Sequence, residues 1–201
     1  MKIVKTLLAA AISLTAFGAQ ANELVTNGSF ESITGSNPVG TYRKVNAGET
    51  DIVGWTVGGT SVDIINSAYG AISGNSIDML GSPGPGSLSQ MLSTVVGQTY
   101  VLSFDLSYNG GTYKDIGVSL AGGAQTFFTG GSPFNHHTLQ YTATSASTQL
   151  AFFSTGDANY SGAVLDNVSV AAVPEPETYA MLLAGLGLMG GIARRRRNKQ
   201  A

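Results

Sequence analysis

The chain has 201 residues, no cysteine and a formal net charge of −2. That length leaves room for one ordinary domain plus processing segments. The lack of cysteine excludes disulfides, thiolate metal sites and thiol nucleophiles. Residues 22–173 hold three basic and ten acidic side chains, a net charge of −7. This balance argues against nucleic acid or anionic lipid as a partner of that part, because phosphate contacts need clustered Lys and Arg.

The first 21 residues have the three parts of a secretory signal peptide. Lys2 and Lys5 give a positive start, residues 7–17 are mostly apolar, and Ala19 and Ala21 fit the small-x-small cleavage rule. We therefore expect cleavage after Ala21 and secretion of the remainder. An ordinary N-terminal helix is the alternative.

Residues 22–171 have the pattern of an all-β domain. Short β-rich runs alternate with Gly, Ser, Asn and Pro, and helical periodicity of useful length is lacking. Ten such runs predict a β-sandwich or barrel. The expected strands are residues 53–57, 61–65, 76–80, 88–94, 99–108, 116–120, 125–129, 136–142, 149–154 and 164–170.

Alternation within these runs predicts which side chains face the core. The strand at 99–108 places five large residues on one face: Tyr100, Leu102, Phe104, Leu106 and Tyr108. Trp55 shares its parity with Val53 and Val57, so we expect it in the core as well. His136 and His137 are adjacent on a strand and point to opposite faces, so we expect surface or edge residues rather than a metal pair.

Two carboxylates near the ends of this domain form a candidate metal site. Asp166 shares its parity with Val164, Val168 and Val170, so it points inward if they do. A buried carboxylate needs donors or a cation. The first and last strands of a sandwich are often neighbours, which would bring Glu31 close to Asp166. Carboxylates and main-chain carbonyls suit a structural Ca²⁺; the alternative is that Asp166 caps a turn through local amides.

Three further carboxylates lie inside predicted strands, where Asp is uncommon. Asp63, Asp78 and Asp105 are flanked by apolar residues of the opposite parity, so we expect them to face away from the core, on one sheet face. With an aromatic platform such a face would bind sugar, and the candidate rings are Tyr69, Tyr108 and Tyr113. The alternatives are a solvated acidic face and paired carboxylates for glycoside hydrolysis.

An ordered set of short motifs carries a family resemblance. "ELVTNGSFE", "GWTV", "SVDII", "SIDML", "LSFDLS" and "LDNVSV" follow one another as in the bacterial choice-of-anchor secreted proteins, which are related to plant cell-wall proteins of unknown function. The resemblance implies a galactose-binding-like jelly-roll β-sandwich and a non-catalytic extracellular module. In similar carbohydrate-binding modules, carboxylates at the places of Glu31 and Asp166 hold a structural calcium.

The C-terminus combines a short motif, an apolar run and a basic cluster. Residues 172–178 read as a linker with Pro174, Glu175 and Pro176, and residues 179–201 read as a helix with a basic tail. Fifteen apolar residues, 179–193, span about 22 Å as a helix, short of a hydrocarbon core of about 30 Å. Four arginines follow and would stay cytoplasmic: Arg194, Arg195, Arg196 and Arg197.

This order resembles the PEP-CTERM sorting signal of Gram-negative bacteria. The resemblance implies cleavage near the Pro-Glu-Pro motif by an exosortase, after a transient stay in the inner membrane, and association with exopolysaccharide or biofilm matrix. A plain C-terminal anchor is the alternative. We therefore expect a secreted module at the cell surface or in the matrix that binds carbohydrate. The alternatives are a purely structural surface protein and a glycan-active enzyme.

Overall fold

The computed structural model describes residues 22–40, 42–110, 115–121, 126–156, 161–174 and 176–197. The predicted signal peptide with Ala19 and Ala21 lies outside these residues, as do Tyr113 and Glu175. The side chains of Pro176, Arg194, Arg196 and Arg197 are also outside the described part.

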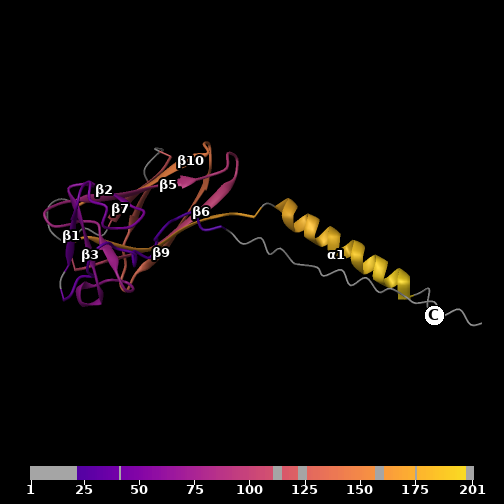
Figure 1. Ribbon diagram of the computed structural model, residues 1–201, viewed down its shortest axis with the longest axis horizontal. Coiled ribbons are helices and arrows are strands. Elements are labelled where there is room, and N and C mark those ends of the chain that lie inside the picture. Colours follow the sequence, from indigo (N-terminus) through magenta and orange to yellow (C-terminus); the bar gives the residue numbers. More distant parts are fainter. Residues whose placement is uncertain are drawn as a thin grey trace, which may run out of the picture.

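The described strands form two antiparallel sheets packed face to face (Figure 1). One sheet has six strands in the order β1 (Arg43–Asn46), β3 (Ser61–Ile65), β4 (Ser76–Asp78), β11 (Ala163–Ala172), β6 (Thr99–Tyr108) and β9 (Asn135–Thr142). The other has five in the order β2 (Thr56–Gly59), β5 (Gly86–Ser93), β10 (Ser147–Ser154), β7 (Asp115–Leu120) and β8 (Thr126–Thr129). The predicted all-β sandwich is confirmed.

Each of the ten predicted runs overlaps a strand of the structure, and one strand was not predicted. β1 has the sequence Arg-Lys-Val-Asn, and only Val45 among its four residues is buried. Such a short run with two charged residues has no hydrophobic alternation to detect. It forms because it pairs with β3 at the edge of the six-stranded sheet.

The main core lies between the two sheets. Phe30, Phe104 and Phe152 are fully buried there, and Trp55 is 3% exposed. The Trp55 ring lies between those of Phe30 and Phe152, with centroids 5.5 and 6.1 Å away. Its Nε1 donates to the Asn27 carbonyl oxygen (3.0 Å), which satisfies its one polar atom. The predicted core positions of Trp55, Tyr100, Leu102, Phe104 and Leu106 are confirmed.

A β-bulge in β11 corrects one prediction. Pairing between β11 and β6 shifts between Asp166 and Ser169, and Asn167 adopts a left-handed φ of 51°. The extra residue reverses the alternation. Val168 and Val170 therefore point into the core as expected, whereas Val164 and Asp166 lie on the outer face of the six-stranded sheet. Asp166 is buried, as predicted, but not between the sheets.

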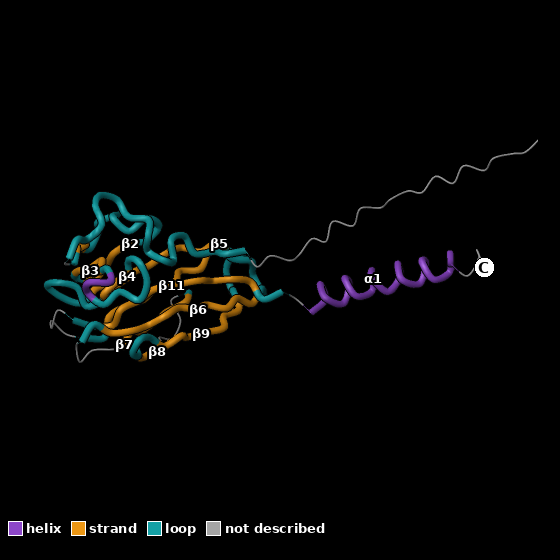
Figure 2. Tube along the Cα trace, turned by 90° about the horizontal axis from the view of Figure 1, so that it is seen from below, coloured by secondary structure: helices purple, strands orange, loops and turns teal. Residues whose placement is uncertain are grey.

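The C-terminal helix α1 (Pro176–Arg197) lies outside both sheets, as Figure 2 shows. It is longer than the predicted run of residues 179–193, because it begins at Pro176, within the predicted linker of residues 172–178, and extends through the four arginines. Among the residues that the structure describes, no helix is long and apolar enough to span a membrane. The predicted helix is thus confirmed, and its passage through a membrane is not.

Candidate functional site

The predicted acidic residues do gather on one sheet face. Asp63 of β3 lies directly opposite Asp78 of β4, and Asp105 of β6 lies directly opposite Asp166 of β11. Their apolar neighbours in sequence point into the core, so the prediction that they face away from it is confirmed. The face is not solvated, however. Asp63, Asp78 and Asp105 are only 2%, 1% and 7% exposed.

This outer face holds a small second set of buried residues. Ile65, Leu80 and Val164 are fully buried yet do not belong to the cluster between the sheets. Loops surround this end of the sandwich in Figure 2. Two of them are tied together, because Asn66 Nδ2 donates to the Pro38 carbonyl oxygen (2.6 Å) and Asn75 Nδ2 to Asn37 Oδ1 (3.0 Å). A sequence pattern does not show loops folding over a sheet, so the burial was not predicted.

Asp78 is held by nitrogen donors from two directions. Its Oδ1 accepts from Leu80 N (3.0 Å), and its Oδ2 accepts from Asn109 Nδ2 (2.5 Å). Burial nevertheless raises the pKa of Asp78 to about 7, and the neighbouring charge of Asp63 adds to the rise. Asp78 is therefore a carboxyl group that changes its charge near neutral pH.

Asp63 is less completely satisfied. Its Oδ2 accepts from Ser82 N (3.1 Å), while its buried Oδ1 has no hydrogen-bond partner among the described residues. Burial raises the pKa of Asp63 as well. Lys44, opposite it on β1, acts the other way through its charge.

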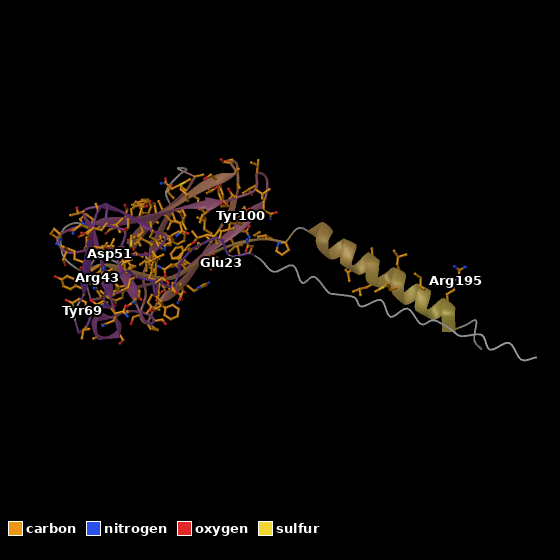
Figure 3. The ribbon with its side chains drawn as sticks, in the orientation of Figure 1. Glu23, Arg43, Asp51, Tyr69, Tyr100 and Arg195 are labelled. Atoms are coloured by element: carbon orange, nitrogen blue, oxygen red, sulfur yellow. The ribbon has the colours of Figure 1, made fainter. Side chains whose placement is uncertain are left out.

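A hollow lies next to Asp78, at the end of β6. It has a volume of about 330 Å³ and is lined by Tyr69, Gly70, Tyr108, Asn109 and Gly110. Tyr69 ends the short 3₁₀ helix η1 (Ser67–Tyr69), and Gly70 after it takes a left-handed φ of 87°, which glycine adopts readily. Figure 3 shows Tyr69 at the end of the sandwich away from Glu23 and Tyr100.

Asn109 joins the hollow to the buried carboxylates. Its Nδ2 is bonded to Asp78, while its Oδ1 is buried without a hydrogen-bond partner among the described residues. An unmatched buried acceptor costs about 1–3 kcal/mol. The lining of the hollow thus contains two tyrosines and one amide residue, and the unmatched oxygen of that amide is buried. The sequence predicted Tyr69 and Tyr108 as candidate rings but missed Asn109, whose signal was an Asn-Gly pair directly after the best strand.

Asp105 belongs to a separate part of the face. Its two carboxylate oxygens accept from His136 Nδ1 (2.7 Å) and Asn167 Nδ2 (2.8 Å). His136 and His137 lie on the edge strand β9, and His137 Nε2 bonds instead to the Thr129 carbonyl oxygen (3.0 Å). The prediction that the two histidines are surface or edge residues is confirmed. Asp105 does not line the hollow.

Glu31 and Asp166 meet at one loop. Asn75 N donates to Glu31 Oε1 (2.8 Å), and the next residue, Ser76, donates through Oγ to Asp166 Oδ2 (2.8 Å). Burial raises the pKa of Asp166 to about 6, and the charge of Glu31 adds to that rise. The predicted closeness of the two carboxylates is confirmed. Asn167 N also donates to Asp166 Oδ1 (2.7 Å), so the predicted local cap is present too.

The donor set fits a hard cation in part. Glu31 and the fully buried Asp166 supply carboxylate oxygens, which are the ligands that Ca²⁺ prefers. Because Ca²⁺ takes six to eight oxygen ligands, main-chain carbonyls would have to supply the others. Within the described ranges, no group of three or more His, Cys, Asp or Glu side chains could hold a metal ion. The calcium site therefore stays a prediction.

The chain belongs to a family of proteins of unknown function, and a protein-sorting motif follows the family domain. Residues 23–171 match the family described as "Protein of unknown function (DUF642)", and the chain is a member of it. Residues 172–197 match the PEP-CTERM protein-sorting motif. This motif directs secretion and surface targeting in bacteria. No curated protein matches the chain.

Solved structures of carbohydrate-binding modules are similar to this chain. TmCBM61 in complex with β-1,4-galactotriose has a TM-score of 0.53 and 15% identity, with 76% of this chain and 100% of that chain covered. A family 35 carbohydrate-binding module from Clostridium thermocellum has a TM-score of 0.43 and 15% identity, covering 66% and 100%. The CBM22-1 xylan-binding domain of Paenibacillus barcinonensis Xyn10C has a TM-score of 0.44 and 17% identity, covering 70% and 99%. At 15% identity the likeness to TmCBM61 shows the galactose-binding-like jelly-roll fold alone.

Proposed function

We propose that the β-sandwich is a non-catalytic glycan-binding module and that the hollow beside Tyr69 and Tyr108 is its sugar site. The observation that carries the proposal is that two tyrosines, Tyr69 and Tyr108, and the polar residue Asn109 line one hollow. The fold that the chain shares with carbohydrate-binding modules supports it.

The chemistry of the lining suits a sugar. The apolar C–H face of a pyranose packs against an aromatic ring, and its hydroxyl groups form hydrogen bonds with polar residues of the lining such as Asn109. The volume of about 330 Å³ is at the lower end of the ~300–1,000 Å³ usual for ligand pockets. The site would take one or two sugar residues rather than a long chain.

The residues that line the hollow favour binding of a sugar over its hydrolysis. Glycoside hydrolysis needs two carboxyl groups flanking the scissile bond. The described lining contains no Asp or Glu, and Asp78 stands behind Asn109, bonded to it. These positions support a binding role for the hollow over the glycan-active enzyme.

The sorting motif in the tail indicates where the module would bind its glycan. A PEP-CTERM motif after the module implies a passage through the inner membrane of a Gram-negative bacterium, with processing by an exosortase. The sugar site would then act at the cell surface or in an exopolysaccharide or biofilm matrix. Val173 N bonds to the Thr99 carbonyl oxygen (2.8 Å), so the tail leaves the sandwich beside the start of β6, at the end opposite the hollow. A module held by this tail keeps its sugar site free.

The test is binding of the protein to a glycan panel and to the exopolysaccharide of its own host. Tyr69→Ala and Tyr108→Ala are each expected to weaken binding by up to about tenfold, on the scale of about 0.5–1.5 kcal/mol per ring contact. Tyr42→Ala is the matched control, because Tyr42 is exposed, contacts Tyr69 and does not line the hollow. If neither polymer nor oligosaccharide binds, the chain is better described as a purely structural surface protein.

We further propose that Glu31 and Asp166 hold a structural Ca²⁺. The rise of the Asp166 pKa to about 6, to which the Glu31 charge contributes, supports it, since a cation between them would offset both burial and repulsion. The ion would tie the N-terminal segment to β11 and to the loop at Asn75, and so stabilise the end of the sandwich that carries the hollow.

A further inference from the structure

The turn between β5 and β6 carries two exposed valines at the end of the sandwich where the tail leaves. Val95 and Val96 are 67% and 63% exposed. Gln98 N bonds to the Val95 carbonyl oxygen (3.0 Å), which closes a β-turn. Gly97, the third residue of this turn, has a left-handed φ of 85°, which glycine adopts readily. Val96 therefore lies at the tip of a tight turn.

Hydrogen bonds keep this turn in place. Val95 N donates to Tyr100 Oη (2.9 Å), and Gly97 N bonds to the Ala143 carbonyl oxygen (2.8 Å), which joins the turn to the one between β9 and β10. Figure 3 shows Tyr100 at the end of the sandwich from which the chain continues to α1. The two valines thus present apolar surface on a fixed backbone, so a partner that covers them does not have to order a loop.

The same turn fastens the tail to the sandwich. Val173 N bonds to the Thr99 carbonyl oxygen (2.8 Å), and Gln98 Nε2 donates to the Val173 carbonyl oxygen (2.7 Å), so both main-chain polar groups of Val173 are held. The helix α1 begins three residues later, at Pro176. Three steps of extended chain reach at most about 11 Å. A membrane that holds the start of α1 must therefore lie close to the β5–β6 turn.

Charge also distinguishes this end of the sandwich. The domain has a net charge of −7, which anionic lipid head groups repel. The turns at residues 94–98 and 143–146 contain no charged residue. Glu23 lies near this end, but its carboxylate is bonded to β11, where it accepts from Val170 N (2.9 Å) and from Ser169 Oγ. The two uncharged turns can approach a bilayer with little repulsion.

We propose that Val95 and Val96, here called the valine tip, insert into the surface of the inner membrane while the tail is held there. The bilayer is then the partner of this end of the sandwich, and the contact depends on apolar burial rather than on basic residues. The inference rests on the transient membrane stay that is part of the proposed function.

The valine tip adds to a weak hold by the tail. The apolar run of residues 179–193 spans about 22 Å as a helix, which is shorter than a hydrocarbon core of about 30 Å. Two valine side chains contain fewer carbons than a myristoyl chain, whose membrane binding is itself marginal and reversible. The valine tip therefore assists the helix before the cut at the Pro-Glu-Pro motif, and it is too small to retain the module at the membrane afterwards.

The test uses the lack of cysteine in the chain. In the chain without its predicted signal peptide, residues 22–201, Val96→Cys gives a single site for a nitroxide spin label. The labelled chain is bound to vesicles of phosphatidylethanolamine and phosphatidylglycerol. We expect the label to be accessible to oxygen dissolved in the lipid and shielded from a water-soluble relaxation agent.

Val39→Cys is the matched control for this label. Val39 is a valine with 88% exposure, and the adjacent Pro38 carbonyl oxygen accepts from Asn66 Nδ2, beside η1 and the hollow. A label at position 39 is therefore at the opposite end of the sandwich. We expect it to remain accessible to the water-soluble agent when the chain is bound to vesicles.

A binding measurement without labels checks the same contact. Replacing Val95 and Val96 together by serine should raise the dissociation constant for the vesicles about tenfold, the scale expected for the lost burial of two partly inserted valines. Val39→Ser should leave the dissociation constant unchanged. Melting curves check that the variants fold.

The outcomes separate this proposal from the proposed function. If the label at position 96 is as accessible to water as the label at position 39 in vesicle-bound chain, the valine tip is overturned and the membrane stay of the tail is not. Spin–spin broadening between labels at position 96 would show a second copy on this surface and would also overturn the lipid contact. A chain that does not bind vesicles overturns the membrane stay and the valine tip together. The sugar site is tested separately by the glycan panel.

Discussion

Asp63 and Asp78 lie directly opposite each other on β3 and β4, on the same outer sheet face, with exposed fractions of 2% and 1%. Two carboxylates side by side with little water are disfavoured as a charged pair. Burial accordingly raises the pKa of both, that of Asp78 to about 7. This pair links the stability of the sandwich to pH.

Stability should fall as the pH rises from about 4 to about 7. In the unfolded chain Asp78 loses its proton near pH 3.8, whereas in the folded chain it keeps it to about 7. Between these values the folded state binds more protons, so the free energy of unfolding decreases with pH. In the metal-free protein Asp166, with its pKa raised to about 6, acts in the same direction, so the measurement is made with a chelator present. Urea titrations at a series of pH values measure the slope.

Asp78→Asn provides the control for that slope. The variant cannot ionise at this position and keeps the acceptor for Leu80 N. It should be more stable than wild type at pH 8 by an amount that shrinks toward pH 4. A wild-type stability that rises steadily across this pH range, unchanged by the substitution, would contradict the raised pKa.

Gly28 should not tolerate a side chain. A Cβ there would lie 1.8 Å from the Val168 carbonyl oxygen, which is main chain and cannot turn away. Val168 N also bonds to the Gly28 carbonyl oxygen (2.9 Å), so the N-terminal segment would have to separate from β11. We expect Gly28→Ala to cost about 3 kcal/mol, at the upper end for overpacking.

Gly48→Ala is a useful comparison for Gly28. Gly48 has a left-handed φ of 85° with open space around it, so only backbone strain of about 1–2 kcal/mol is expected. Thermal melts of the two variants distinguish the steric clash expected in Gly28→Ala from the backbone strain expected in Gly48→Ala. Equal losses for both would show that the segment at Gly28 has room to move.

The fold could be predicted from the sequence because the hydrophobic alternation that marks a strand lies within a few consecutive residues. In β6, alternation from Tyr100 to Leu106 marks the core face directly. β1 was missed because its pairing with β3 forms it, and the Asn167 bulge was missed because a left-handed residue inside a strand leaves no change in hydrophobic pattern. The bulge explains why Asp166 could be predicted as buried while its face was wrong.

The site could be predicted only in part. Alternation along the strands predicted that Asp63, Asp78 and Asp105 share one sheet face. Tyr69 and Tyr108 were predicted as candidate aromatic rings for a sugar site. What joins Tyr69 to Tyr108 is a loop fold that brings residues 39 positions apart to one hollow, and no period in the sequence encodes it. Asn109 had no flanking pattern that distinguishes a bonded amide from a turn residue.

Calcium removal should lower the melting temperature if Glu31 and Asp166 hold the ion. A ligand that binds only the folded state stabilises it, by about 2.7 kcal/mol at a concentration one hundred times its dissociation constant. Melts with added Ca²⁺ and with a chelator measure this difference. Glu31→Gln should abolish it, whereas Asp105→Asn, on the same sheet face but bonded to His136 and Asn167, should keep it. An identical midpoint with and without the chelator in the wild type counts against the ion.

The mature protein should lack both ends of the chain. The signal-like start predicts loss of residues 1–21, and the PEP-CTERM motif predicts a second cut near Pro174–Pro176, before the helix α1. Intact mass of the protein recovered from its host reads both cuts at once, because each removes a segment of different mass. Substituting alanine for Arg194–Arg197 should leave the first cut and impair the second, since the basic cluster holds the helix at the membrane for processing. A mass that retains α1 in the secreted wild-type protein would favour the plain anchor over the sorting signal.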